Sequence, residues 1–219
     1  MDINFIREQL PLYVEAAKLT IYIAVIGIFL AILAGLLCGM IRYFRIPVLK
    51  QISACYIELS RNTPLLIQLF FLYFGLPKLG IVLSSESCAV IGLTFLGGSY
   101  MAEVFRSGLD NVSPAQTEAA LALGMKKSQV FYYIILPQAV SNSIPAFCAN
   151  IIFLIKETSV FSVVALADLM FVAKDLIGIY YKTDEALFLL VMAYLILLLP
   201  VSLLCSLVER RIRYAEYGN

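Results

Sequence analysis

The sequence predicts an all-α membrane protein with about five transmembrane helices. Its 219 residues are 62% hydrophobic and 14% charged, with a mean hydropathy of +0.92, whereas soluble domains average roughly 45–50% apolar and about 25% charged residues. Two uncharged apolar runs are each long enough to cross a bilayer, which takes about 20 residues. The length suits one ordinary domain, so residues 1–219 are expected to form a single transmembrane domain.

The first and last spans are the clearest. Leu19–Ile41 and Ala186–Val208 each contain 23 residues and no charged side chain. The first run is too long for the core of a signal peptide, and no cleavage-like site follows it. We therefore expect it to stay in the mature protein as a transmembrane helix.

The three middle spans are interrupted by proline, glycine and polar residues. Asn62–Pro77 is uncharged but short, and it would reach full length only if its helix began before Glu58. Ser87–Ala102 is rich in small residues, and Ala139–Ile155 contains Pro145. Such residues suit helices that pack closely on one another or line a path through the membrane.

The placement of basic residues predicts the orientation. With five spans, three basic regions fall on one side of the membrane: Arg42, Arg45 and Lys50; Arg106, Lys126 and Lys127; and Arg210, Arg211 and Arg213. The positive-inside rule makes that side cytoplasmic. We therefore expect the N-terminus outside, the C-terminus inside, and the segment between the third and fourth spans in the cytoplasm.

Several classes of chemistry are absent from the sequence. It contains no histidine, and its five cysteines form no CxxC pair, so neither a metal site nor a disulfide framework is expected. There is no G-x-x-x-x-G-K-[ST] phosphate loop, so the chain is not expected to bind ATP in the Walker manner. A net charge of +1 gives no case for nucleic-acid binding. We expect no catalytic residues, no metal and no cofactor in this chain.

A polar, alanine-rich segment stands out between the third and fourth spans. Ser113 and Pro114 can open a helix as its N-cap and first residue, with Gln116 placed for a capping box. The helix is expected over Ala115–Leu123, closed by Gly124 and followed by a second helix that ends at Pro137. A helix this short is not stable alone, so the loop at about 110–137 needs a partner surface.

The segment reads Glu118-Ala-Ala, then three residues, Gly124, nine residues and Ile134-Ile-Leu-Pro137. This spacing resembles the EAA loop of ATP-binding-cassette (ABC) importer permeases. Three further stretches are similar to those of polar-amino-acid importer permeases: Glu58-Leu-Ser-Arg-Asn-Thr-Pro-Leu-Leu-Ile-Gln68, Ser99-Tyr-Met-Ala-Glu-Val-Phe-Arg-Ser-Gly108, and Lys156-Glu-Thr-Ser159 followed by Ala167-Asp-Leu. Ser99 departs from the pattern, because alanine is usual there. The resemblance covers essentially the chain from Leu10 to the terminal Glu-Arg-Arg.

The resemblance implies the type I importer (MetI-like) fold and the role of a permease subunit in an ATP-driven importer of polar amino acids. Its implied setting is a bacterial cytoplasmic membrane. The implied partners are a second permease, identical or related, an ABC ATPase that binds ATP and Mg²⁺, and an extracytoplasmic solute-binding protein. The residues implied in ATPase coupling are Glu118, Ala119, Ala120, Gly124 and Pro137. The alternatives are a secondary transporter, disfavoured because no inverted repeat is evident, and a membrane scaffold without transport.

Ionisable residues inside the membrane are candidates for substrate contact. Glu103 either attracts the amino group or a cationic side chain of the substrate, or only pairs with Arg106 or another charge. Asn62 and Thr63, beside Pro64, form a helix kink alone or line the path as well. A third candidate group interrupts the fourth span and forms either a structural cap and ion pair or a substrate contact: Lys156, Glu157, Thr158 and Ser159.

Overall fold

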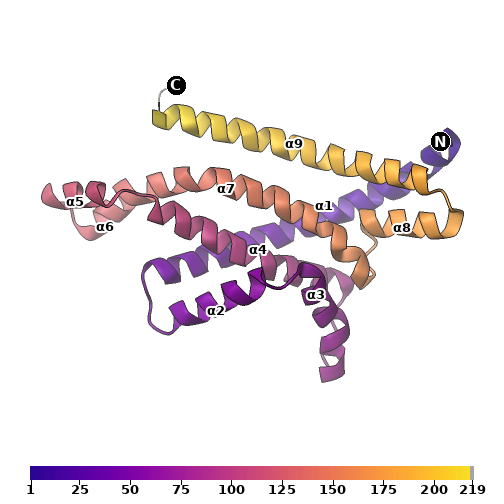
Figure 1. The fold of residues 1–219 in the computed structure, drawn as a ribbon, viewed down its shortest axis with the longest axis horizontal. Helices are drawn as coiled ribbons and strands as arrows, with labels where there is room; N and C mark the ends of the chain where they lie inside the picture. The colour runs from indigo at the N-terminus through magenta and orange to yellow at the C-terminus, as the bar shows by residue number, and fades with distance from the viewer. Residues whose placement is uncertain (218–219) are drawn as a thin grey trace.

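The computed structural model describes residues 1–217, and these are almost entirely helical (Figure 1). The elements are α1 (Ile3–Tyr43), α2 (Leu49–Arg61), α3 (Leu65–Phe70), η1 (Phe71–Gly75), η2 (Leu76–Leu79), α4 (Ser85–Asp110), α5 (Pro114–Ala122), α6 (Lys127–Val130), η3 (Phe131–Ile135), α7 (Leu136–Glu157), η4 (Thr158–Val164), α8 (Leu169–Tyr180) and α9 (Thr183–Tyr217).

Within the described residues, four continuous helices are long and apolar enough to cross a membrane: Ile3–Tyr43, Ser85–Asp110, Lys127–Val164 and Thr183–Ile212. They contain the predicted first, third, fourth and fifth spans. The all-α prediction is confirmed, and each long helix extends beyond its uncharged run because helices continue into the polar interface.

The predicted second span is not one continuous helix. α2 ends at Arg61, and Pro64 is in an extended conformation, with φ −57° and ψ 141°, before α3 begins. Proline lacks the N–H that a helix needs, and it disfavours helical backbone at the preceding residue. The chain therefore bends, and Figure 1 shows the segment that starts with α3 turning away from the direction of α2. The expectation of a single helix from before Glu58 to Pro77 was wrong.

Hydrogen bonds from a side chain of α3 hold the bend between α2 and α3. Nε2 of Gln68 donates to the carbonyl of Ser60 at 3.1 Å and to that of Thr63 at 3.0 Å. The apolar helix beyond the break runs only from Leu65 to Leu79. The break therefore places the polar end of α2 beside α4 and α7 at a defined angle.

α4 lies at the centre of the bundle, and small residues let its neighbours approach closely. A Cβ added at Gly35 of α1 would lie 2.3 Å from Cβ of Met101, and one at Gly108 of α4 would lie 1.9 Å from Oγ of Ser143 in α7. No larger residue fits at either crossing without displacing a helix. Close packing through small residues is the usual means of association between membrane helices.

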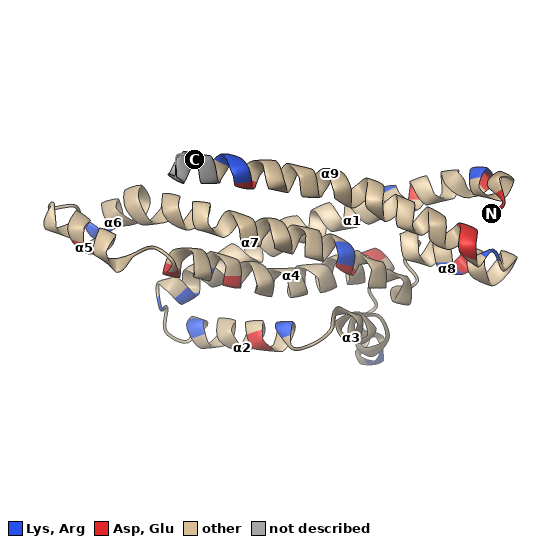
Figure 2. Ribbon diagram, turned by 45° about the horizontal axis from the view of Figure 1, so that its top comes forward, with Lys and Arg blue, Asp and Glu red and all other residues tan. Residues whose placement is uncertain are grey.

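The helix ends that carry the predicted basic regions lie together at one end of the molecule. The C-terminal ends of α1 and α4, together with α5, α6 and the late part of α9, lie at one end of the molecule, and the N-terminus and α8 lie at the other (Figures 1 and 2). Arg42, Lys126 and Arg210 belong to the first group; the side chain of Arg213 lies outside the described part. Which end faces the cytoplasm stays a prediction.

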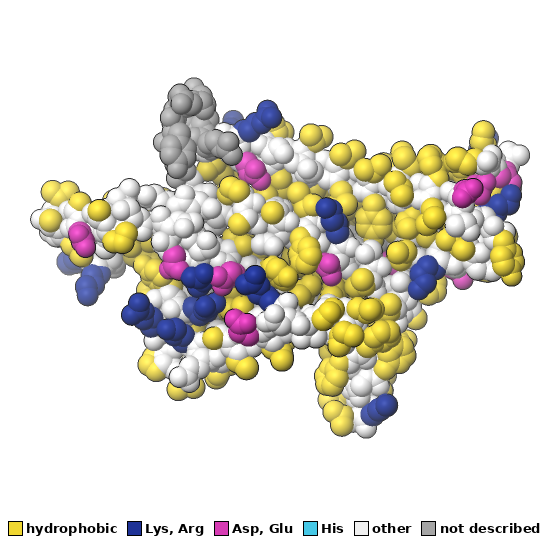
Figure 3. All heavy atoms as spheres, viewed as in Figure 1, with side chains coloured by type: hydrophobic (Ala, Val, Ile, Leu, Met, Phe, Trp, Pro, Cys, Tyr) yellow, Lys and Arg dark blue, Asp and Glu magenta, His cyan; other side chains and the backbone are white. Residues whose placement is uncertain are grey.

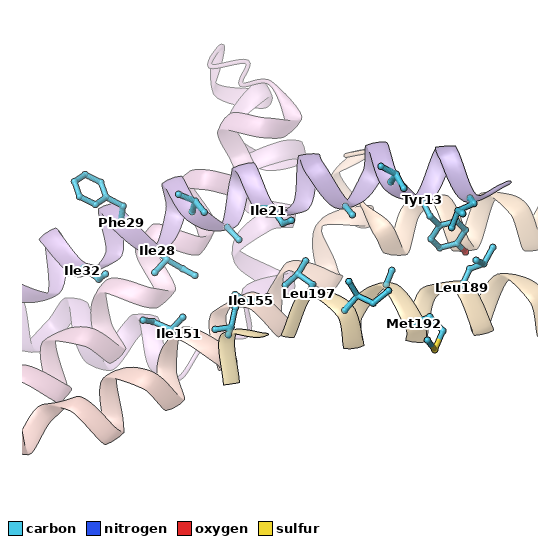
Figure 4. A pocket seen from close by; sticks show the side chains of 18 residues that line it. Tyr13, Ile21, Ile28, Phe29, Ile32, Ile151, Ile155, Leu189, Met192 and Leu197 are labelled. Carbon is cyan, nitrogen blue, oxygen red and sulfur yellow. The ribbon is translucent and has the colours of Figure 1, made fainter. Parts of the chain in front are cut away.

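Apolar side chains cover much of the bundle surface (Figure 3), as expected where helices face lipid. An apolar groove of about 660 Å³ lies between α1, α7 and α9 (Figure 4). Its one polar lining group, the Tyr13 hydroxyl, donates to the carbonyl of Ala186 at 2.7 Å. A charged solute would lose its hydration in this groove without compensation, so it is not a candidate substrate site.

Candidate substrate cavity and coupling loop

A smaller, polar cavity lies where the break between α2 and α3 meets α4 and α7. Its volume is about 320 Å³. Apolar walls come from Leu65, Leu96 and Val160, and the groups that distinguish it chemically are Arg61, Asn62, Thr63, Tyr100, Phe153 and Glu157. It combines a cation, a carboxylate, hydrogen-bonding groups and aromatic rings.

Arg61 provides the positive charge. It is the last residue of α2, and its guanidinium carbon lies 5.2 Å from the ring centroid of Tyr100 on α4. Tyr100 in turn contacts Phe153 of α7, with ring centroids 5.1 Å apart. A guanidinium above an aromatic face is stabilised by the ring quadrupole, and it keeps N–H donors for a carboxylate.

Glu157 provides the negative charge. It is the last residue of α7 and is half-buried. The α-helix ends there, and the Thr158 hydroxyl donates to the carbonyl of Ile155 at 2.7 Å as the chain enters the 3₁₀ segment η4. Among the side chains that the structure describes, neither Glu157 nor Arg61 has an ion-pair partner. The cavity therefore offers opposite charges to a zwitterion.

Asn62 and Thr63 cap the break and line the cavity at the same time. Nδ2 of Asn62 donates to the carbonyl of Glu58 at 2.8 Å, and the Thr63 hydroxyl donates to the carbonyl of Leu59 at 2.8 Å. Both side chains border the polar cavity. The two interpretations of this pair, kink and lining, are thus compatible, and contact with substrate stays a prediction.

The other candidates from the fourth span do not line this cavity. Lys156 is exposed, Thr158 is fully buried in its own turn, and Ser159 is half-buried. Of that group, only Glu157 lines the cavity, and Arg61 and Tyr100 were missing from the predicted set. The available signal was the rule applied to Glu103: a charge inside a membrane-spanning region is a functional candidate.

Glu103 lies in an ion-pair network at the end of the bundle where α1 meets α4. Its Oε2 accepts from Nη1 of Arg42 at 3.2 Å, and its Oε1 accepts from Nε of Arg106 at 3.0 Å. Arg106 also pairs with Asp110 one turn further along α4. The ion pair considered in the sequence analysis is therefore present, and it joins α1 to α4. Glu103 does not line the polar cavity. Substrate contact by Glu103 stays a prediction.

The loop between α4 and α7 has a rigid helical end. At the end of α5 the N–H of Gly124 donates to the carbonyl of Leu121 at 2.9 Å, and the N–H of Met125 donates to that of Ala120 at 3.2 Å. This is the Schellman pattern, which needs a left-handed residue after the helix. Gly124 has φ +83°, as expected for that position. The helix itself is one residue offset from the predicted Ala115–Leu123.

The start of α5 differs from the prediction in one detail. Ser113 is the N-cap and Pro114 the first helical residue, but the Ser113 side chain makes no capping hydrogen bond. The side-chain oxygen of Gln116 instead accepts from Nε2 of Gln138 on α7. The predicted capping box is therefore not formed, because Gln116 ties α5 to the next membrane helix.

The prediction that the second helix of the 110–137 loop ends at Pro137 was wrong. The helix that begins at Lys127 continues through Pro137 to Val164. The turn just before the proline widens into the π-helical segment η3, with the N–H of Leu136 donating to the carbonyl of Phe131. A π turn relieves the missing N–H and the ring clash of proline inside a helix. Pro137 thus marks a change of helical pitch at the base of the loop.

α5 presents nearly all of its surface to solvent. Glu118 and Ala119 are exposed, and Leu123 is 85% exposed. Ala120 is its only buried residue, packed in a small cluster with Val112, Val130, Ile135 and Ala139. A short helix anchored at one residue, with an exposed leucine at its tip, is suited to fill a cleft on another protein.

Comparison with known proteins identifies the class. Residues 23–214 match the family described as binding-protein-dependent transport system inner membrane component. The chain therefore belongs to this family, the permeases of ABC transporters, as the sequence resemblance predicted. A member of this family is a transport component and not an enzyme.

The similarity extends over whole chains. The probable amino-acid permease protein YxeN of Bacillus subtilis (strain 168) is 36% identical over 213 residues, 96% of this chain and 95% of the relative. The glutamine transport system permease protein GlnP of Escherichia coli (strain K12) is 31% identical, over 97% of this chain and 98% of that protein.

Solved structures of ABC transporters have the same fold as this chain. A crystal structure of an amino acid ABC transporter with histidines contains a chain with a TM-score of 0.91 and 32% identity, covering 96% of this chain and 99% of that one. The MetNI methionine ABC transporter shares the fold, with a TM-score of 0.77 at 19% identity. The predicted MetI-like fold is confirmed.

Proposed function

We propose that this chain is the permease subunit of an ATP-driven importer of polar amino acids. The named relatives handle amino acids or glutamine, and they cover nearly the whole chain. The secondary-transporter and scaffold alternatives have no comparable support. The single observation that carries the substrate assignment is that Arg61 and Glu157 line the same cavity.

The cavity matches the chemistry of a free amino acid. The Arg61 guanidinium suits an α-carboxylate, because its planar donors can make two parallel bonds to both carboxylate oxygens. The Glu157 carboxylate suits an α-ammonium group, and Asn62 and Thr63 add hydrogen-bonding capacity for a polar side chain. Each charge would gain a partner when substrate enters, which supports binding at membrane depth.

Energy reaches the cavity through α5 in this proposal. Glu118, Ala119 and Ala120 lie on the docking helix α5, and Gly124 follows its end. An ABC ATPase that holds ATP and Mg²⁺ receives this helix. Pro137 and η3 connect the loop to α7, whose far end carries Glu157. Movement of α5 would therefore be transmitted along one helix to the cavity. The permease contributes two conformations, and ATP binding by the partner biases their populations.

The remaining partners follow from the same role. A second permease, identical or related, completes the path, and a solute-binding protein delivers substrate on the side opposite α5. The protein is placed in a bacterial cytoplasmic membrane, with its N-terminus outside and its C-terminus in the cytoplasm. The segregation of Arg42, Lys126 and Arg210 to the α5 end supports this orientation.

The substrate assignment is tested by ATP-driven uptake into proteoliposomes that contain the chain with its ATPase and solute-binding protein. Arg61→Gln should raise the apparent KM for glutamine about tenfold to a hundredfold, because a charge-assisted hydrogen bond contributes roughly 1.5–3 kcal/mol. Glu157→Gln should have an effect of similar size. Basal ATP hydrolysis should persist in both variants.

Arg61→Lys is the matched variant, because it keeps the charge and loses the bidentate geometry. It should fall between wild type and Arg61→Gln. The carboxyl amide of glutamine, which lacks the α-carboxylate, should compete weakly with glutamine for uptake by wild type. Its affinity relative to that of glutamine should be higher in Arg61→Gln. An unchanged KM in both Arg61→Gln and Glu157→Gln, with normal folding, would remove the cavity from the substrate path.

A further inference from the structure

A second polar cavity lies at the α5 end of the bundle, between the end of α1, the start of α2 and the end of α4. Its volume is about 300 Å³, and it is lined by Arg42, Tyr43, Arg45, Lys50, Arg106 and Asp110. Figure 3 shows Lys and Arg side chains gathered over this part of the surface. The import function proposed above makes no use of this cavity.

The cavity carries an excess of positive charge. Arg42 and Arg106 are both bound by Glu103, and Arg106 also by Asp110. Among the described side chains, Arg45 and Lys50 have no carboxylate partner. Four cations therefore face two carboxylates, and a surplus of two positive charges remains. That surplus attracts an anionic phosphate group.

The backbone of the connecting loop is held in an unusual shape at this place. Arg45 and Val48 have φ values of +52° and +66°, in the left-handed region that side chains rarely adopt. The N–H of Arg45 donates to the carbonyl of Arg42 at 3.2 Å, which ties the turn to the end of α1. The two strained residues turn the chain from α1 into α2 so that Arg45 and Lys50 border one cavity.

The cavity lies at the level of the membrane interface. The 23 uncharged residues of the first span end at Ile41, immediately before Arg42. Beside the cavity, the rings of Tyr43 and Phe44 each lie 5.6 Å from the ring of Phe131, the start of η3. Aromatic side chains gather at the boundary between hydrocarbon and headgroups. A ligand here would have its polar part in water and its remainder in lipid.

Exposed apolar side chains continue from the rim of the cavity. Phe44, Val48, Leu49 and Ile52 are 54%, 66%, 44% and 58% exposed, on the loop and first turn of α2. Neither a free phosphate ion nor an acidic protein surface would make use of these residues. A lipid would, because its headgroup and its acyl chains need adjacent cationic and apolar surfaces.

We propose that this cavity binds the phosphate of an anionic phospholipid, with the acyl chains lying over Phe44, Val48 and Ile52. Arg45 and Lys50 provide the positive charge that attracts the lipid phosphate. Arg42 and Arg106 stay engaged with Glu103 and shape the inner wall. The site requires no import activity, so it can be tested on the chain itself.

The experiment is native mass spectrometry of the full-length chain in detergent, titrated with dioleoyl phosphatidylglycerol or dioleoyl phosphatidylcholine. Wild type should retain one phosphatidylglycerol in preference to phosphatidylcholine. The double variant Arg45→Gln/Lys50→Gln should bind phosphatidylglycerol about 30-fold more weakly, since each basic residue near a membrane surface contributes about fivefold. Both residues are exposed, so its melting temperature should match wild type.

The matched control, Lys78→Gln/Lys174→Gln, removes two exposed positive charges elsewhere and should bind phosphatidylglycerol as wild type does. Unchanged binding in Arg45→Gln/Lys50→Gln would overturn the proposal. Displacement of the lipid by excess inorganic phosphate would overturn it in favour of a free-anion site. Unchanged lipid binding with weaker docking of the ATPase would overturn it in favour of a protein contact.

Discussion

Asp168 is a fully buried carboxylate at the start of α8. Its Oδ1 accepts from the N–H of Phe171 at 2.9 Å, which caps the helix, and its Oδ2 has no partner among the described atoms. Burial raises the pKa of Asp168 to about 6, against the smaller lowering effect of the Phe171 N–H. The capping role favours Asp or Asn at this position, and only Asp incurs the cost of burying a charge.

This predicts a pH-dependent stability. Because the folded-state pKa lies above the unfolded value of 3.8, folded protein holds a proton that unfolded protein loses between about pH 4 and about pH 6. Stability should fall as pH rises through that window, by about 3 kcal/mol in total, and stay level above it. Asp168→Asn keeps the cap and should flatten this part of the profile. Melting temperatures in detergent across the window compare the two, and identical slopes would refute the assignment.

Glu103 is the residue for which the ion-pair role can be separated from a substrate role. Glu103→Gln leaves Arg42 and Arg106 without their shared carboxylate, so the melting temperature should fall while the KM for uptake changes little. Breaking a partly buried pair costs up to about 3 kcal/mol, and less where solvent screens it.

Arg106→Gln should reproduce the loss of stability, and the double variant Glu103→Gln/Arg106→Gln should partly recover it, since fewer unpaired charges remain. A KM raised at least tenfold in Glu103→Gln at normal stability would instead favour contact between Glu103 and the substrate. Measuring both quantities on the single and double variants decides between the two roles.

At the scale of elements, the α5 loop depends on one glycine. Gly124→Leu places a branched side chain at φ +83°, which costs on the order of 1 kcal/mol or more and distorts the Schellman end of α5. Membrane insertion should be normal, because the site is exposed. Transport and binding-protein-stimulated ATP hydrolysis should be lost. Stimulation at the wild-type level would remove the coupling role from this loop.

Gly178 offers the matched control. It lies in α8 with ordinary backbone angles, and an added Cβ there would meet no other atom. Gly178→Leu introduces the same side chain at the opposite end of the molecule and should leave stimulated hydrolysis unchanged. A loss in both variants would indicate a general effect of the added leucine and not a specific effect on α5.

Much of the element pattern could be predicted from local rules. The runs of uncharged residues located the long helices, and Ser113, Pro114 and Gly124 located α5 to within one residue. The same rules could not predict that the helix would break at Pro64 but continue through Pro137. Pro64 is extended and separates α2 from α3, whereas the helix widens into η3 just before Pro137 and continues through it.

The polar cavity was only partly predictable, because its residues come from α2, α3, α4, α7 and η4. Asn62 and Thr63 were found through their proline neighbour. Arg61 and Tyr100 are far apart in sequence, and only the packing of α2 on α4, through the hydroxyls of Tyr56 and Ser60 on the carbonyl of Phe95, brings them together. No sequence period encodes such a contact.

At the scale of the whole molecule, the orientation is open to direct labelling. In a cysteine-free background, Lys126→Cys should react with a membrane-impermeant maleimide only after cells are opened, and Asn4→Cys should react in intact cells. Both side chains are exposed, so access to the reagent reports the side of the membrane. Labelling of Lys126→Cys from outside would reverse the predicted topology.

In the proposed function, a separate ATPase drives solute through this chain. The most direct test is uptake of labelled glutamine by proteoliposomes that contain the chain with or without its ATPase and solute-binding protein. Uptake should require ATP, both partners and an intact α5, and an ion gradient alone should produce none. Uptake by the chain alone, driven by an ion gradient, would refute ATP-driven import and identify the chain as a secondary transporter.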